Sequence, residues 1–440
     1  MKKLNRRALS VMLLALFIVL GLFTYVQRYA KDGEYWASYF SRLNSLSEGY
    51  VTDRYGVMLA AFTANDNRFN EDRSTRIANY HVTGDFWDRT GTGILTGFSR
   101  QLHSYSPITG MTQTRTASLK LNVDSALNKK AYAALAERRG AVGVVNYRTG
   151  EMICLVSSPA IDPIENDPVA PEGVYINRLL SASFTPGSIF KLVTAAAAIE
   201  CVPSIWQRSF FCEGEDEISG VIFHCPFEHY TNDFAGALAN SCNIAFAKIA
   251  ISVGQREMVN HVRDYGFLDS HNLDGIPTAA GSYPLDYVGD PETGWSGIGQ
   301  STDLICPYSM LRYVAAIAND GMLVEPKLID DGQPPEKTML VNPETAKTMQ
   351  RLMRNNVVQV YGDNRFPGLT VCGKTGTAEV GDGTDHAWFT GFLQDEEHPY
   401  AFIAFVEHGG GGLSVAVPVA NTVLQAAVRR GTELDFGTGN

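Results

Sequence analysis

The first thirty residues place the strongest constraint on how this chain can fold. Four basic residues within the first seven precede an almost uncharged run from Ala8 to Val26. At 1.5 Å per residue, a helix over this run is long enough to cross a hydrocarbon core of roughly 30 Å. No small-x-small cleavage site precedes Gln27. We therefore expect a cytoplasmic tail over residues 1–7 and a retained transmembrane signal anchor over residues 8–27.

The basic residues also predict the orientation of the anchor. Lysine and arginine next to a membrane span stay on the cytoplasmic side, so we expect a single-pass protein of the cell membrane whose folded part lies outside. Residues 28–115 are polar and turn-rich, which favours a small N-terminal pedestal or dimerisation-like domain. A larger domain is predicted over residues 116–431, followed by a tail over residues 432–440.

Length and charge narrow the class of protein further. The chain has 440 residues, 45% of them hydrophobic, which suits one large domain and a smaller one. Its net charge is -11, and no stripe of lysine and arginine is present. We therefore expect no nucleic-acid partner.

The pattern of apolar and polar residues after residue 119 indicates an α/β fold. Residues 127–138 have a helical pattern, residues 141–145 and 152–156 are typical of buried strands, and Arg148-Thr-Gly150 predicts the turn between those strands. A strand pair beside a helix predicts layers of sheet and helix.

A serine and a lysine stand at the start of an apolar stretch. Ser188 and Lys191 follow the turn Pro186-Gly187, and the next residues, 192–200, are apolar all round. This predicts a buried helix that begins at or beside Ser188 and carries both side chains on one face. Burial lowers the pKa of a lysine, which then becomes able to take the proton of a serine nucleophile. An isolated Ser-x-x-Lys also fits a helix cap with a surface lysine.

Two further polar motifs follow in the chain. Ser241-Cys-Asn243 lies between two apolar helical stretches, so both polar side chains can face one cleft. Lys374-Thr-Gly-Thr377 lies among residues of strand type, where alternation puts Thr375 and Thr377 on one face and Lys374 and Gly376 on the other. Glycine in a strand often marks the close approach of another element. Taken singly, these motifs also fit a turn and a strand end.

Ser-x-x-Lys, Ser-x-Asn and Lys-Thr-Gly in this order resemble the penicilloyl serine transferases. The chain resembles class B penicillin-binding proteins in particular, in a short form with a small pedestal. The segments that carry this further resemblance are 48–56, 80–84, 177–178, 295–300, 315–321 and 386–389.

The resemblance implies the fold and the place of the site. It implies a penicillin-binding or serine β-lactamase-like transpeptidase domain, with an antiparallel sheet flanked by helices. It also implies an all-helical lobe between Lys191 and about Pro277. The active site is then expected between sheet and lobe.

The resemblance also implies a mechanism for peptidoglycan cross-linking. Ser188 attacks the carbonyl between the two terminal D-alanines of a peptide stem, and Lys191 takes its proton. Ser241 relays a proton to the departing amine, Lys374 holds Ser241 and lowers the pKa of Lys191, and Asn243 orients the substrate amide. An amine of a neighbouring stem then resolves the acyl-enzyme.

Substrate binding is assigned by the same resemblance. The backbone N–H groups of Ser188 and Thr377 form the oxyanion hole, while the Thr375 and Thr377 hydroxyls beside Gly376 and Lys374 bind the substrate carboxylate. The expected partners are lipid-linked peptidoglycan stems, β-lactams and a polytopic SEDS-type glycan polymerase. No metal and no organic cofactor are expected.

Several alternatives stay open. A D,D-carboxypeptidase or a β-lactamase shares the fold and lets water resolve the acyl-enzyme. A catalytically idle scaffold of wall synthesis, or a penicillin sensor, keeps the fold without turnover. His386 is a weaker candidate base, and His408 to Gly412 predicts a hairpin turn between terminal strands rather than an oxyanion loop.

Seven cysteines exclude a fully paired disulfide scaffold. Cys212 and Cys225 lie in a loop-like stretch, and outside the cell a disulfide between them is plausible. With His224 and His229 they also suggest zinc, but the spacing matches no standard zinc pattern.

Overall fold

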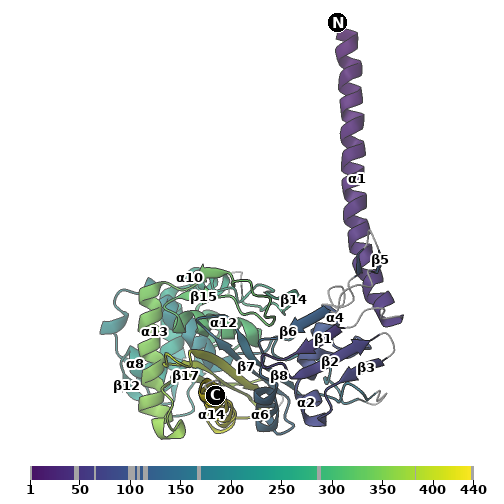
Figure 1. Ribbon diagram of the computed structural model, residues 1–440. Coiled ribbons are helices and arrows are strands. Elements are labelled where there is room, and N and C mark those ends of the chain that lie inside the picture. The colour runs from purple at the N-terminus through teal and green to yellow at the C-terminus, as the bar shows by residue number, and fades with distance from the viewer. Residues whose placement is uncertain are drawn as a thin grey trace.

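The computed structural model consists of a globular body and one long helix that projects from it (Figure 1). It describes residues 2–43, 49–63, 66–97, 105–106, 110–111, 117–165, 170–284, 289–381 and 383–437.

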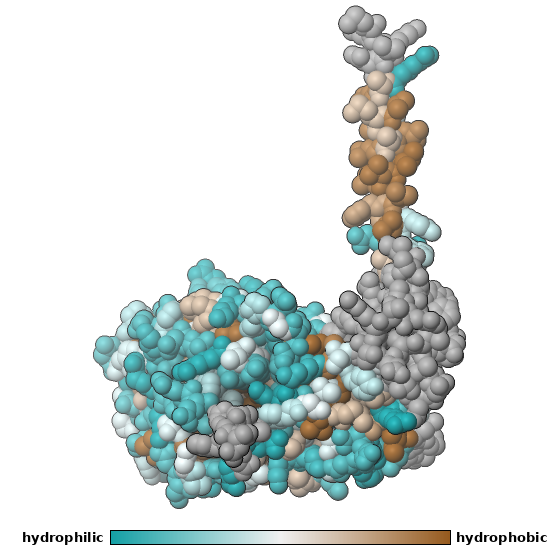
Figure 2. Space-filling model, viewed as in Figure 1, coloured by the Kyte–Doolittle hydropathy of each residue, from teal (hydrophilic) through white to brown (hydrophobic). Residues whose placement is uncertain are grey.

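Helix α1 (Lys2–Leu43) contains the apolar run predicted as the anchor. Within the described residues it is the one helix long and apolar enough to cross a membrane, over Arg7–Ala30. Its side chains make no contact with a core there, and Figure 2 shows mostly hydrophobic residues on the face of this segment that is in view. The protein is therefore built as a single-pass membrane protein whose helix continues beyond the membrane-spanning segment.

The pedestal contains a four-stranded sheet in the order β3-β2-β1-β6. These strands are β1 (Gly49–Thr52), β2 (Met58–Thr63), β3 (Asp66–Phe69) and β6 (Ala117–Lys120). β1 pairs with β6 in parallel and with β2 in antiparallel orientation. The sheet therefore contains strands from both the predicted pedestal, residues 28–115, and the predicted large domain, residues 116–431.

Short elements complete the pedestal: α2 (Arg73–Ala78), α3 (Tyr80–Thr83), α4 (Ile94–Gly97), β4 (Tyr105–Ser106) and β5 (Gly110–Met111). Residue 48, the first of the segment 48–56, lies outside the described residues.

The buried carboxylate of Asp53 accepts hydrogen bonds from both the pedestal and the large domain. Asp53 is 1% exposed and follows β1. One of its oxygens accepts the N–H groups of Tyr55 and Val57, both at 2.9 Å, and thereby closes the β1–β2 turn. The other accepts the Ser125 hydroxyl at 2.6 Å, at the start of α6 (Ser125–Leu135). The neighbouring Arg54 forms an ion pair with Glu151 at 3.4 Å.

The centre of the large domain is a five-stranded antiparallel sheet in the order β17-β18-β19-β7-β8. The strands are β17 (Val371–Ala378), β18 (His386–Leu393), β19 (Tyr400–Val406), β7 (Gly140–Asn146) and β8 (Met152–Ser158). The antiparallel sheet expected from the resemblance is confirmed, and it includes both strands predicted at residues 141–145 and 152–156.

Both faces of this sheet are covered by helices (Figure 1). Ile403 and Phe405 of β19 enter the apolar cluster that contains α12 (Pro307–Ala318). Their neighbour Ala404 enters the second cluster, which contains α14 (Val417–Gly437). Alternate side chains of one strand thus fill two cores, so every residue of the strand is apolar and the sheet is buried on both faces.

The lobe lies on the α12 side of the sheet and follows the Ser188 turn. Its helices are α7 (Lys191–Cys201), η2 (Ile205–Gln207), α8 (Phe234–Ala239), α9 (Asn243–Val253) and α10 (Gln255–Asp264). The remaining elements of the domain are α11 (Asp290–Gly297), β13 (Asn272–Leu273), β14 (Ile276–Pro277), β15 (Met322–Val324), β16 (Lys337–Met339), α13 (Pro343–Asn356), η3 (Val357–Tyr361), η4 (Asp363–Arg365) and η5 (Gly412–Ala416).

The lobe is not all-helical, which corrects that part of the expectation. It also holds β9 (Phe210–Cys212) paired with β12 (Tyr230–Asn232), and β10 (Glu215–Ile218) paired with β11 (Val221–His224). Ser219-Gly220 has positive φ at both residues, which is the geometry of a two-residue hairpin turn. This turn accounts for the pair β10 and β11 inside an otherwise helical region.

One smaller expectation is wrong. His408 to Gly412 does not join two strands, because η5 and α14 follow β19 directly. The tail predicted at residues 432–440 is helical as far as Gly437. All seven cysteines are free thiols, so Cys212 and Cys225 form no disulfide in this structure.

The contacts of Asp53 generate a stability prediction. We expect Asp53→Ala to lower the free energy of unfolding by about 2–3 kcal/mol, because buried donors on both sides of the pedestal contact lose a charged acceptor. The measurement is equilibrium urea unfolding of the full chain in detergent. Asp269→Ala removes an exposed aspartate and serves as the control. Equal losses in the two variants would contradict the structural role of Asp53.

Candidate active site

Ser188 lies in a tight turn that leads into a buried helix. The 3-10 turn η1 (Gly187–Phe190) runs directly into α7. Every side chain from Leu192 to Ala198 is buried, so the predicted buried helix beside Ser188 is confirmed. Ser188 itself is only half-buried. A reactive hydroxyl is thus held rigidly at the edge of a core and stays accessible from one side.

Lys191 is fully buried beneath this serine. Its Nζ lies 3.0 Å from Ser188 Oγ, 2.6 Å from the Ser241 carbonyl oxygen and 2.7 Å from Asn243 Oδ1. The last two atoms are acceptors without a hydrogen of their own. A neutral lysine donates its two hydrogens to them and keeps its lone pair for the Ser188 hydroxyl. The geometry therefore suits proton transfer from Ser188 to Lys191.

The Ser241–Asn243 motif lies where α8 ends and α9 begins. Ser241 has a φ of +55°, a conformation that few residues other than glycine adopt, and Asn243 is the first residue of α9. This turn points both the carbonyl and the hydroxyl of Ser241 at Lys191, at 2.6 and 3.2 Å. The side chains of Ser241 and Asn243 therefore both contact Lys191 Nζ.

Lys374 reaches the same hydroxyl from the sheet. It lies on β17 and is fully buried. Its Nζ lies 2.9 Å from Ser241 Oγ and 2.8 Å from the carbonyl oxygen of Thr375. The Ser241 hydroxyl therefore connects two lysines that are far apart in the sequence.

Burial controls the charge of both lysines. Desolvation lowers the pKa of Lys191 to about 8. Desolvation, followed by the charge of Lys191, lowers the pKa of Lys374 well below its usual range. Two buried ammonium groups that share one hydroxyl titrate as a coupled pair. A neutral amine beside Ser188 is therefore accessible near neutral pH.

The strand β17 presents its residues as predicted. Lys374 and Gly376 are buried, Thr375 is half-buried and Thr377 is exposed. A side chain at Gly376 would come within 2.9 Å of Ile189 Cγ2 and 3.1 Å of the Pro186 carbonyl oxygen. Glycine is thus needed here because the Ser188 turn lies directly against the strand.

A second glycine, in the turn that holds Ser188, lies against β17. Gly187 has a φ of +54°, and a Cβ on it would lie 2.5 Å from the carbonyl oxygen of Thr377. The backbones at Ser188 and Thr377 are therefore neighbours. Their N–H groups are the pair expected to form an oxyanion hole.

Three contacts of the site were not predicted from the sequence. The Tyr361 hydroxyl accepts the backbone N–H of Thr375 at 3.2 Å, and the Sγ atom of Cys225 accepts the N–H of Asn243 at 3.0 Å. The Asn243 side chain also donates to the carbonyl oxygen of His224 at 3.0 Å. None of these partners shares a motif or a local spacing with the residue that it contacts.

The family profile described as "Penicillin binding protein transpeptidase domain" matches residues 140–425. The chain belongs to the penicillin-binding protein transpeptidase family.

Two related proteins align with this chain over different fractions of their own length. Peptidoglycan D,D-transpeptidase PbpA of Mycolicibacterium smegmatis is 25% identical, over 98% of this chain and 99% of the relative. Stage V sporulation protein D of Bacillus subtilis is 28% identical, over 63% of this chain and 44% of the relative. Together with the family match, these relatives identify the chain as a class B penicillin-binding protein.

Solved structures support the fold. Penicillin-binding protein A from Mycobacterium tuberculosis, solved as a ceftriaxone acyl-enzyme complex, has a TM-score of 0.77 and 23% identity, covering 87% of this chain and 98% of that chain. Pseudomonas aeruginosa PBP2 in complex with WCK 5153 has a TM-score of 0.74 and 24% identity, covering 86% of this chain and 96% of that chain. The transpeptidase fold with its antiparallel sheet is thereby confirmed.

The two histidines noted in the sequence contact each other, with ring centroids 4.9 Å apart, in this penicillin-binding protein. His386 is 6% exposed, packs edge-on against Phe184 and Phe405, and accepts the backbone N–H of His408 at 3.1 Å. These contacts show that His386 is a residue of the core. Lys191 is a titratable residue whose side chain lies at hydrogen-bond distance from Ser188.

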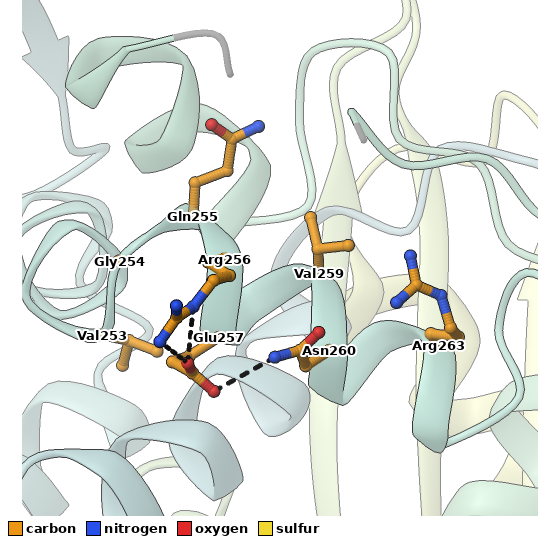
Figure 3. A pocket seen from close by; sticks show the side chains of 8 residues that line it. All are labelled: Val253, Gly254, Gln255, Arg256, Glu257, Val259, Asn260 and Arg263. Atoms are coloured by element: carbon orange, nitrogen blue, oxygen red, sulfur yellow. Dashed lines mark hydrogen bonds and ion pairs between the residues drawn. The ribbon is translucent and has the colours of Figure 1, made fainter. Parts of the chain in front are cut away.

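A separate hollow lies on the lobe, at the junction of α9 and α10 (Figure 3). It has a volume of about 610 Å³, and Glu257 contacts Arg256 and Asn260 on its wall. None of its eight lining residues is a candidate catalytic residue. The hollow is therefore distinct from the site around Ser188.

The contact between Gly376 and the Ser188 turn generates a prediction. We expect Gly376→Ala to slow acylation by a fluorescent penicillin by at least about tenfold, because a 1 Å displacement of reacting groups has effects of this size or larger. The rate is measured with the full chain in detergent. Gly91→Ala, at a glycine whose Cβ would meet nothing within 4 Å, is the control. An unchanged rate in Gly376→Ala would contradict the tight apposition.

Proposed function

We propose that Ser188 is the acylated nucleophile of this transpeptidase and Lys191 its general base. The observation that carries the proposal is the continuous chain Ser188 Oγ, Lys191 Nζ, Ser241 Oγ and Lys374 Nζ, with separations of 3.0, 3.2 and 2.9 Å. Ser188 attacks the carbonyl carbon between the terminal D-alanines of a peptide stem, and its proton passes to Lys191.

Collapse of the tetrahedral intermediate releases D-alanine. The bond from the carbonyl carbon to the leaving nitrogen breaks, and that nitrogen takes a proton through the Ser241 hydroxyl. Lys374 orients this hydroxyl by donating to it at 2.9 Å. Asn243 holds Lys191 through its Oδ1 atom, and its Nδ2 group orients the substrate amide once it releases the His224 carbonyl.

Substrate recognition takes place along the exposed side of β17. The backbone N–H groups of Ser188 and Thr377 stabilise the oxyanion, an assignment supported by the close approach of Gly187 to Thr377. The hydroxyls of Thr375 and Thr377, next to Gly376, bind the terminal carboxylate beside the buried Lys374. β-Lactams occupy the same positions and acylate Ser188.

The remaining assignments concern the setting of this chemistry. We propose that residues 1–7 lie in the cytoplasm and residues 8–27 in the membrane, which places the pedestal at residues 28–115 and the transpeptidase domain at 116–431 outside. The basic residues before the span support this orientation. The natural substrate is then a lipid-linked peptidoglycan stem, and the fitting partner is a polytopic SEDS-type glycan polymerase in the same membrane.

Cross-linking with a lipid-linked pentapeptide substrate tests the function directly. We expect the full chain in detergent to form penicillin-sensitive peptide cross-links, Ser188→Ala to form none, and the exposed control Ser181→Ala to match the wild type. Shortened stems without cross-links would assign a D,D-carboxypeptidase. Repeated turnover of a chromogenic cephalosporin would assign a β-lactamase, and activity in Ser188→Ala would exclude Ser188 as the nucleophile.

The lowered pKa of Lys191 predicts the pH dependence of acylation. The proton acceptor is the neutral amine, whose fraction rises as pH rises towards a pKa of about 8. The acylation rate constant should therefore increase roughly tenfold per pH unit below that pH and level off above it. Lys191→Arg, which stays charged, should be slower by roughly a hundredfold or more and lack this rise. A flat profile between pH 6 and pH 9 in the wild type would contradict the assignment.

A further inference from the structure

Four metal-binding side chains meet directly behind the Ser241 turn. The Sγ atoms of Cys212, Cys225 and Cys242 and a ring nitrogen of His229 all lie within 4.8 Å of one another. Cys212 ends β9, Cys225 follows β11, His229 precedes β12 and Cys242 caps α9. Folding therefore brings together ligands from three separate turns of the lobe.

Two of the separations within this cluster match those expected around a tetrahedral ion. Two sulfur ligands at 2.3 Å from a tetrahedral zinc lie roughly 3.8 Å apart, and a sulfur and a nitrogen ligand lie roughly 3.6 Å apart. The Cys225 and Cys242 Sγ atoms are separated by 3.8 Å, and Cys212 Sγ lies 3.6 Å from His229 Nδ1. A disulfide bond requires about 2.05 Å between sulfurs. These two separations therefore fit a metal site, and the distance between the Cys225 and Cys242 sulfurs is too long for a disulfide.

We propose that Cys212, Cys225, His229 and Cys242 bind one zinc ion as a closed structural site. Three thiolates and one imidazole form a complete tetrahedral set, which leaves no position for substrate or water. A disulfide would use only two of the three thiols and would leave the third thiol and the imidazole outside the bond. A zinc ion satisfies all four ligands at once.

Backbone donors around the sulfurs support this assignment. Cys225 Sγ accepts the N–H of Asn243 at 3.0 Å, and Cys242 Sγ accepts the N–H of Ala245 at 3.4 Å, at the N-terminus of α9. N–H donors and the positive end of a helix dipole stabilise thiolate ligands. The neighbouring His224 is not part of the set, because its side chain is 69% exposed and lies 3.7 Å from Glu215.

The ion would position two residues of the active site. Cys242 lies between Ser241 and Asn243, and Cys225 binds the Asn243 backbone. Zinc bound there fixes the strained Ser241 turn from behind, so that its carbonyl and hydroxyl stay on Lys191. This consequence for acylation rests on the proposed roles of Ser241 and Asn243, whereas zinc binding itself does not.

Metal content of the full chain tests the site. The protein is purified in detergent without chelator or histidine tag, and zinc is measured by inductively coupled plasma mass spectrometry. We expect about one zinc per chain in the wild type and in His224→Ala, and a loss in Cys212→Ser and His229→Ala. Cys212→His, which preserves four ligands, should retain zinc and keeps the test valid if Cys212→Ser folds poorly. Wild-type protein that holds less than half an equivalent after zinc supplementation would overturn the proposal.

The state of the thiols gives an independent readout. We expect a chelator to release zinc together with three thiols that were protected from alkylation, and cobalt to replace zinc with thiolate-to-cobalt absorption. A disulfide between any two of Cys212, Cys225 and Cys242 in the freshly purified protein, found by peptide mass spectrometry, would overturn the proposal.

The rate of acylation tests separately whether bound zinc positions Ser241 and Asn243. We expect the rate of labelling by a fluorescent penicillin to fall about tenfold or more after zinc removal, and to return with zinc but not with magnesium. Cys201→Ser, outside the cluster, should match the wild type. Labelling that is independent of zinc in a protein that binds it would overturn the positioning role. Failure of labelling in zinc-loaded wild type would instead contradict the proposed function.

Discussion

The site depends on two buried lysine side chains that meet at one hydroxyl. Lys191 comes from a helix, Lys374 from the sheet, and the Ser241 hydroxyl lies between them at 3.2 and 2.9 Å. Removing ammonium groups from water favours their neutral forms. The chain thereby obtains a neutral amine beside Ser188 without a histidine or a carboxylate. The stability lost by burying these groups is offset by the large apolar cores on both faces of the sheet.

The fold explains how residues from distant parts of the chain reach this point. The antiparallel sheet presents Lys374 on an edge strand, and glycines at 187 and 376 allow the serine turn to lie directly against that strand. The lobe supplies Ser241 and Asn243 from the turn between two helices. Behind that turn, the side chains of Cys212, Cys225, His229 and Cys242 from separate turns of the lobe come together.

Much of this arrangement was predictable because it follows from local patterns. The apolar run after Gly187 predicted the buried helix, and alternation in β17 predicted that Lys374 and Gly376 lie on one face and Thr375 and Thr377 on the other. Other features depend on tertiary contacts that no local spacing records. The cluster of Cys212 and Cys242 forms only when separate turns of the lobe come together. Strands β10 and β11 within the lobe are joined by the Ser219-Gly220 turn, whose conformation favours a hairpin in otherwise helical surroundings.

The central claim is that Lys191 is held in an environment that lowers its pKa to about 8. Nuclear magnetic resonance of lysine side chains, labelled with carbon-13 at the ε position, measures this value directly in the full chain. We predict one resonance that titrates near pH 8 and disappears in Lys191→Met. Titration of the Lys191 resonance near 10.4, the value of an exposed lysine, would contradict the account of the site.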